Sequence, residues 1–315
     1  MIGCIITVAA AIWFWNLTHR VANAVFIVCP GIAFTGLLVL GSEDVLERLQ
    51  QWIDVQPLRV VAVPSGLWIL YIIYAFGMGV ADTRGAIVMA VYLAVPFVAF
   101  APFRHRPVRR WIEPAIILWI WLPLEFGIVR SVLITRQGAD LHYVFAQLLA
   151  IVSGIVAFMA WNRTPGVGFR FEWDREITIV GLLHFVMFAA IAIPLGIAID
   201  FIHYSFSLSK LAPAPAAFVG IFFFTALPEE FLFRGLIQNW IERMTHKPVL
   251  SLAVAAIIFG ASHLNNGPPI PNYRYFLLAG IAGIFYGRAW RKSGSLMSSA
   301  FTHALVDTFW SVFFR

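Results

Sequence analysis

The sequence predicts an all-α protein, a polytopic transmembrane helical bundle with eight to eleven membrane helices. The first observation behind this prediction is composition, since 61% of the 315 residues are hydrophobic and only 12% are charged. Soluble globular domains carry about 25% charged residues. Because so few charges cannot cover a water-facing surface, we expect lipid to solvate most of the exterior.

The second observation is the recurrence of apolar runs between short charged or turn-forming stretches. Candidate spans lie near residues 2–15, 22–41, 60–80, 86–103, 113–129, 143–161, 177–200, 216–240, 249–264, 275–290 and 295–314. The shortest of these fall below the ~20 residues that an α-helix needs to cross a bilayer, and little polarity separates the first two runs. The number of crossings is therefore predicted as a range.

The third observation is an uneven distribution of Lys and Arg between the two sets of loops. If every run crosses, fourteen of these residues lie in loops 42–59, 104–112, 162–176, 241–248 and 288–294, and seven lie in the opposite loops. Because cytoplasmic loops are enriched in Lys and Arg, the first set is predicted to be cytoplasmic. The net charge of +6 is then explained by topology, and no basic patch with interleaved aromatic residues predicts nucleic-acid binding.

Segment 42–56 has a different pattern from the apolar runs. Its apolar residues share one helical face, and its charged residues lie elsewhere on the wheel. This pattern predicts a short amphipathic helix in the lipid headgroup layer.

The run from residue 216 to 240 contains Pro228-Glu229-Glu230, followed by Arg234. Ionisable groups inside a membrane segment are costly and are functional candidates by default. Glu230 and Arg234 are about 40° apart on an α-helix and are predicted to form a structural pair. Glu229 lies about 140° from Arg234, so it is left free to face a cavity and to act as a general base.

Two further polar motifs lie in later apolar runs. Small residues precede His263 at the end of one run, and His303 and Asp307 have i,i+4 spacing in the last run. Each has an ordinary explanation, an interfacial histidine and a structural His–Asp pair. At 1.5 Å per residue, however, Glu229, His263, His303 and Asp307 lie about 18, 21, 14 and 20 Å from the predicted cytoplasmic ends of their segments. The shared depth predicts that these side chains meet near the middle of the bilayer.

The three motifs, read as E-E-x-x-x-R, F-x-x-x-H and H-x-x-x-D on successive helices, resemble a known family. This is the CPBP family (CAAX protease and bacteriocin-processing, Abi) of intramembrane glutamic endopeptidases, which includes the type II CAAX prenyl endopeptidases. Residues 286–295, YGRAWRKSGS, also resemble the stretch that precedes the last motif in that family. The resemblance covers roughly residues 176–315, which are predicted to form the protease domain. Residues 1–175 are interpreted as N-terminal membrane-anchoring helices of unknown role.

The resemblance implies a role for each motif residue. Glu229 and His263 would match the pair that activates water, and His303 and Asp307 the pair that stabilises the tetrahedral oxyanion. Many members carry Asn at the position of Asp307, and an ionised Asp repels an oxyanion to which an Asn amide would donate. We therefore expect Asp307 to orient His303, which then donates alone.

Three alternatives remain open. Glu229, His263, His303 and Asp307 also suit a two-His, two-carboxylate zinc or iron site, although H-E-x-x-H is absent. A non-catalytic bacteriocin-immunity or scaffold protein would be expected to lose these polar residues, and all are present. Transporters place carboxylates at the bilayer midplane as well, but no inverted repeat relates the two halves.

We therefore expect an intramembrane endopeptidase that hydrolyses a peptide bond of a membrane-held protein with activated water. No cofactor and no bound metal are expected. The expected partners are the lipid bilayer and a protein or peptide substrate, prenylated CAAX proteins being the best-known case in the family. The expected location is an integral membrane position, in a bacterial inner membrane.

Overall fold

Helices form almost all of the ordered secondary structure, as the sequence predicts. The computed structural model describes residues 24–103, 109–133 and 139–315, so the first predicted span, 2–15, lies outside the described residues. Within those ranges no strand is present, and the β-type pairing is a single bridge between Tyr204 and Phe314. The all-α prediction is confirmed.

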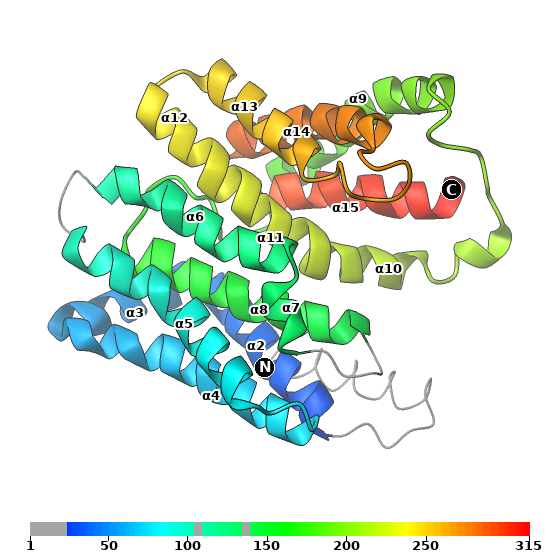
Figure 1. The fold of residues 1–315 in the computed structure, drawn as a ribbon. Coiled ribbons are helices and arrows are strands. Elements are labelled where there is room, and N and C mark those ends of the chain that lie inside the picture. Colours follow the sequence, from blue (N-terminus) through cyan, green and yellow to red (C-terminus); the bar gives the residue numbers. More distant parts are fainter. Residues whose placement is uncertain (1–23, 104–108, 134–138) are drawn as a thin grey trace. The chain divides into compact units, whose positions relative to one another are not determined.

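The chain divides into two compact units, Met1–Pro165 and Gly166–Arg315. The helices described in the first unit are α2 (Ala24–Leu40), α3 (Glu43–Val55), η1 (Pro57–Val61), α4 (Ala62–Gly77), α5 (Thr83–Phe100), η2 (Ala101–Phe103), α6 (Arg109–Glu125), α7 (Ile128–Ser131), α8 (Ala139–Ile155) and the π-helical η3 (Val156–Trp161) (Figure 1). The predicted division at residues 175 and 176 concerns function and stays a prediction.

The second unit contains all the predicted site residues. Its helices are α9 (Arg175–Ala198), η4 (Leu208–Lys210), α10 (Ala214–Ile221), η5 (Phe222–Ala226), α11 (Leu227–Glu230), η6 (Phe231–Gln238), α12 (Asn239–Thr245), α13 (Pro248–Ala261), α14 (Tyr273–Ser293) and α15 (Leu296–Phe313). Segments α10 to α12 run on as one long helix, and α15 packs along its first half (Figure 1).

Several helices are long and apolar enough to cross a membrane. Within the described residues five meet this criterion, namely Pro57–Gly77, Thr83–Phe103, His142–Trp161, Arg175–Ala198 and Ala214–Thr245. A sixth is obtained if Val25–Leu40 and Glu43–Val55, which meet at a bend of 95°, count as one span. The predicted count of eight to eleven is not confirmed. Helix α13 has only 14 residues, the last turn of α14 contains Arg291 and Lys292, and α15 contains polar residues such as His303 and Asp307. Helix α3 occupies the segment predicted to be amphipathic, and its place in the headgroup layer stays a prediction.

The long helix changes its winding around the two glutamates. Pro228 has no backbone N–H to donate to the preceding turn. Segments η5 and η6 on either side of α11 are π-helical, so Glu229 and Glu230 lie on a short α-helical segment between two wider ones. Such π segments are rare and are frequent at functional sites.

Helix α14 has clear end signals and lies close to α13. The Asn272 side chain accepts a hydrogen bond from the Tyr275 N–H, and Gly294 ends the helix with a φ of 65°. At the contact with α13, a Cβ on Gly260 would lie 2.7 Å from the Phe276 carbonyl oxygen, and one on Gly283 would lie 3.0 Å from the Ala256 Cα. Glycine therefore sets the approach of these two helices.

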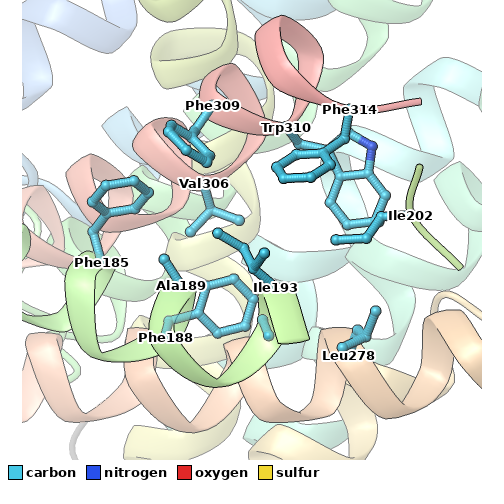
Figure 2. A pocket seen from close by; sticks show the side chains of 11 residues that line it. Phe185, Phe188, Ala189, Ile193, Ile202, Leu278, Val306, Phe309, Trp310 and Phe314 are labelled. Atoms are coloured by element: carbon cyan, nitrogen blue, oxygen red, sulfur yellow. The ribbon is translucent and has the colours of Figure 1, made fainter. Parts of the chain in front are cut away.

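Helix α15 has two chemically different faces. Figure 2 shows its apolar face, where Val306, Phe309 and Trp310 meet Phe185 and Phe188 of α9 around a small apolar cavity of about 30 Å³. The polar residues His303 and Asp307 are one turn apart on the same helix, and His303 Nε2 lies 3.9 Å from Glu229 Oε2 and 3.4 Å from Asp307 Oδ2. Apolar packing on one face thus holds the polar face in position.

We predict that Gly260→Ala destabilises the fold by about 1–3 kcal/mol, the usual cost of forcing extra atoms into a packed contact. The new methyl group would overlap a backbone carbonyl, which cannot rotate away. Thermal denaturation in detergent micelles measures the effect. Gly220→Ala is the matched control, because nothing lies within 4 Å of a Cβ at that position in α10. Equal melting of the two variants would contradict the packing argument.

Candidate active site

Glu230 is the most deeply buried carboxylate of the site. Its side chain has 0% exposed surface, and Arg234 Nε lies 3.1 Å from Glu230 Oε2. The Ser299 hydroxyl donates a hydrogen bond to Glu230 Oε2. His303 Nδ1 donates to Glu230 Oε1 at 2.9 Å. Glu230 therefore joins the long helix to α15, which goes beyond the single pairing with Arg234 that the spacing predicts.

Arg234 is itself sealed inside the unit, with 1% of its side chain exposed. Its guanidinium carbon lies 4.5 Å from the centre of the Phe259 ring and 5.3 Å from that of Tyr286. Arg234 Nη2 also donates to the Gly283 carbonyl at 3.2 Å. Aromatic faces attract a cation, and that attraction grows when water is excluded. The Glu230–Arg234 pair thus connects the long helix with both α13 and α14.

His303 lies among three carboxylates. Besides its bond to Glu230, its Nε2 is 3.4 Å from Asp307 Oδ2 and 3.9 Å from Glu229 Oε2. The ring stacks on Tyr286, with 4.5 Å between centroids and 19° between planes. Both ring nitrogens face carboxylate oxygens, and the stacked tyrosine fixes the ring plane. His303 is therefore held in one orientation with Nε2 directed at Glu229 and Asp307.

The two remaining carboxylates differ from Glu230 in exposure. Glu229 has 30% of its side chain exposed and Asp307 has 37%, against 0% for Glu230. Adjacent glutamates on one helix therefore have separate surroundings, because one is fully enclosed by protein and the other is partly exposed. This difference decides which of them a substrate or a water molecule can reach.

His263 joins the site from the end of α13. Its Nδ1 donates to the Phe259 carbonyl at 2.8 Å, so Nε2 is the nitrogen left for other partners. The ring packs between Phe259 at 4.8 Å and Tyr275 at 4.7 Å, measured between centroids. Phe259 also contacts His303 at 5.8 Å, so one aromatic ring lies against both histidines.

The structure places Glu229 and Asp307 beside His303, and His263 at the neighbouring aromatic rings. Glu229 pairs with His303, and His263 is connected to His303 through the ring of Phe259, which contacts both histidines. The roles expected for Glu229, His263, His303 and Asp307 stay predictions. Within the described ranges, no three His, Cys, Asp or Glu side chains converge in a geometry suited to a metal ion.

Sequence reasoning missed three residues of this site, Tyr275, Tyr286 and Ser299. The two tyrosines are eleven positions apart on α14, which places them about 20° apart around an α-helix. One contacts His263 and the other His303. Ser299 precedes His303 by one helical turn and faces the same partner, Glu230. These periodicities were present in the sequence, but they acquire meaning only once the helix pairs are known.

An apolar helical unit with a buried carboxylate–arginine pair and a histidine beside a second, partly exposed carboxylate has groups suited to proton transfer at a membrane-embedded functional site. Comparison with known proteins identifies the class more closely. Residues 211–309 match the family model described as type II CAAX prenyl endopeptidase Rce1-like, so this part of the chain is similar to the CAAX-type membrane proteases. No curated protein and no solved structure matches the chain. The matched range contains every predicted site residue, and the resemblance read from the motifs is confirmed.

We predict that Arg234→Met lowers stability by about 3–5 kcal/mol, because it leaves Glu230 as a buried carboxylate without its guanidinium. The double variant Glu230→Gln/Arg234→Met should regain much of that loss, since it removes both charges. Denaturation of the purified protein in mixed micelles measures both. The pair would be shown to contribute little if the single variant were as stable as the parent protein.

Proposed function

We propose that this chain is an intramembrane endopeptidase that hydrolyses a peptide bond of a membrane-held protein, with water activated at Glu229 and His263. The observation that carries the proposal is the contrast between the two adjacent glutamates. Glu230 is enclosed and held by three polar partners, whereas Glu229 is 30% exposed and lies 3.9 Å from His303 Nε2. The family match over residues 211–309 supports the same class of reaction.

In the proposed reaction a water molecule lies between the Glu229 carboxylate and the free nitrogen of His263. Glu229 takes a proton from the water as its oxygen attacks the carbonyl carbon of the substrate. The carbonyl oxygen then carries the negative charge of a tetrahedral intermediate. When the carbon–nitrogen bond breaks, the proton held by Glu229 passes to the departing amine. The products are a new carboxylate and a new amine.

The negative oxygen of the intermediate needs hydrogen-bond donors. His303 can supply one from Nε2, and Asp307 at 3.4 Å holds that ring in position. The Asp307 carboxylate cannot supply the second donor that an Asn amide would provide. The chain therefore needs another donor close to His303 and His263, or it works with one.

We propose that the Tyr275 hydroxyl is that second donor. Its ring packs against His263, with 4.7 Å between the ring centroids, so the tyrosine lies on the side of the site that carries His263. The cap formed by Asn272 fixes the first turn of α14 and so fixes the position of the tyrosine. A neutral phenol donates without bringing a negative charge to the site.

The family match and the position of the site support a proposed substrate class. Glu229 is central in Ala214–Thr245, the longest candidate span, so a scissile bond must enter the apolar layer to reach it. A prenylated C-terminal CAAX segment can do so because its lipid inserts beside the protease. A signal segment or C-terminal sorting tail of a bacterial membrane protein is the other source of such a bond. The proposed location is an integral position in a bacterial inner membrane, with lipid and this substrate as partners.

We predict that Glu229→Gln lowers peptide hydrolysis by at least a hundredfold and leaves folding intact, because glutamine fills the same volume but cannot take a proton. Release of a fluorescent fragment from a farnesylated CAAX-type peptide, and from an unprenylated transmembrane peptide, measures the activity in micelles. Glu47→Gln is the matched control, since Glu47 is exposed on α3 in the other unit.

Two results would count against the glutamate mechanism. Full activity of Glu229→Gln would show that Glu229 is not the general base. Complete loss of activity with a chelator, restored by zinc, would favour the metal alternative that uses the same residues. A folded chain that cleaves neither peptide would favour a non-catalytic role.

We predict that Tyr275→Phe lowers kcat by about 10- to 100-fold with little change in KM, which is the signature of a donor used in the transition state. In the Asp307→Asn background, where an amide can donate, the same substitution should cost much less. Steady-state kinetics of the parent protein, the two single variants and the double variant gives the coupling between positions 275 and 307 directly. Equal costs in both backgrounds would show that Tyr275 does not share this task with position 307.

A further inference from the structure

A cavity lined by cations lies in the same unit, at the end of α14 that is predicted to be cytoplasmic. It has a volume of about 380 Å³ and is formed between α9, α13 and α14. Its lining consists of His184, Val249, Leu252, Arg288, Arg291 and Lys292. No acidic side chain is among these residues, so the cavity is lined by cations on one side and by apolar side chains on the other.

Two of the three cations that line this cavity have no acidic partner among the described residues. Arg288 and Lys292 are four residues apart on α14, a spacing at which like charges repel. Arg291 has its own partner, because Arg291 Nε lies 3.3 Å from Glu242 Oε2. The structure describes no ion pair for Arg288 or Lys292 within the described residues, so two positive charges face the cavity together.

A buried histidine completes the lining from the opposite helix. His184 has 3% exposed surface, and its Nδ1 donates to the Val180 carbonyl of its own helix at 2.7 Å. The other ring nitrogen, Nε2, is left for the cavity. Arg288 and Lys292 line the same cavity from α14. Three nitrogen-bearing side chains from two helices therefore meet at one opening.

Two ordinary roles of cations apply here but do not account for the whole arrangement. Basic residues are favoured on the cytoplasmic side of membrane helices and near the C-terminal end of a helix, where α14 ends at Ser293. Either role is satisfied by side chains that spread into solvent. Neither calls for a cavity, nor for a buried histidine on α9 facing the same space.

The cavity is separate from the proposed active site. Tyr286 of α14 faces His303, and Arg288 lies two residues later, about 200° further around the helix. The two sites thus use different faces of α14. The apolar edge of the cavity is provided by Leu252 and by Val249, a residue that is 77% exposed.

We propose that this cavity binds the phosphate group of an anionic phospholipid. The phosphate oxygens accept hydrogen bonds from Arg288, Lys292 and the histidine, and the acyl chains lie along the apolar edge. Basic pockets between membrane helices on the cytoplasmic side have the chemistry to bind such headgroups. The bound lipid links α9, α13 and α14 and stabilises the unit that carries the catalytic side chains.

The experiment titrates the purified full chain, in non-ionic detergent, with short-chain phosphatidylglycerol, phosphatidylcholine or inorganic phosphate. Binding is followed by native mass spectrometry and by the midpoint of thermal denaturation. The test variant is Arg288→Gln/Lys292→Gln. The matched control is Arg48→Gln/Lys247→Gln, which removes two exposed cations from the same predicted side but outside the cavity.

We expect phosphatidylglycerol to bind and to raise the midpoint, and phosphatidylcholine to bind at least about tenfold more weakly. The test variant should lose about tenfold or more in affinity for phosphatidylglycerol, and the control should stay within about twofold of the parent. Inorganic phosphate that competes with the lipid supports the phosphate site, and inorganic phosphate that binds as tightly as the lipid assigns it to free phosphate instead. Equal losses in the test and control variants, or no preference for the anionic lipid, would overturn the proposal.

Discussion

Charged groups inside an apolar helical unit must find partners within the protein, because neither lipid nor excluded water can solvate them. Glu230 shows how this chain meets that requirement. Its two oxygens are held by Arg234, Ser299 and His303, and the guanidinium of Arg234 lies against the rings of Phe259 and Tyr286. Four helices contribute to this one arrangement, so the pairing of a single buried carboxylate positions most of the groups around it.

The same arrangement explains why two neighbouring glutamates can have different tasks. Once Glu230 is committed to Arg234 and His303, Glu229 stands one residue earlier on the helix, partly exposed and 3.9 Å from His303 Nε2. A base that must accept a proton cannot already be saturated with donors. The enclosed carboxylate supplies rigidity, and the accessible one remains available for chemistry.

Close helix packing sets the distances on which this depends. Gly260 and Gly283 let α13 approach α14, which brings Phe259 against His263 and His303 and places both tyrosines of α14 on the site. The cations at the end of α14 lie on another face, beside His184 of α9. One helix thus serves the proposed catalytic site along one face and the proposed lipid site along another, so lipid bound at its end can stabilise the helix that carries Tyr275 and Tyr286.

Composition and local spacing were enough to predict an all-helical membrane protein and the i,i+4 relation of Glu230 and Arg234, because these depend on residue type and on helical periodicity alone. The family was predicted from the resemblance of its three motifs to a known family. The number of spans was not determined in this way. A helix such as α15 contains polar residues, and the sequence alone does not show whether such residues point into the protein within a crossing helix or belong to a helix that does not cross. Only the tertiary structure decided that Glu230 also holds His303 and Ser299, that Tyr275 and Tyr286 line the site, and that His184 meets the cations of α14. These contacts join residues far apart in the chain, and which helix faces lie together is decided by packing, which no local pattern records.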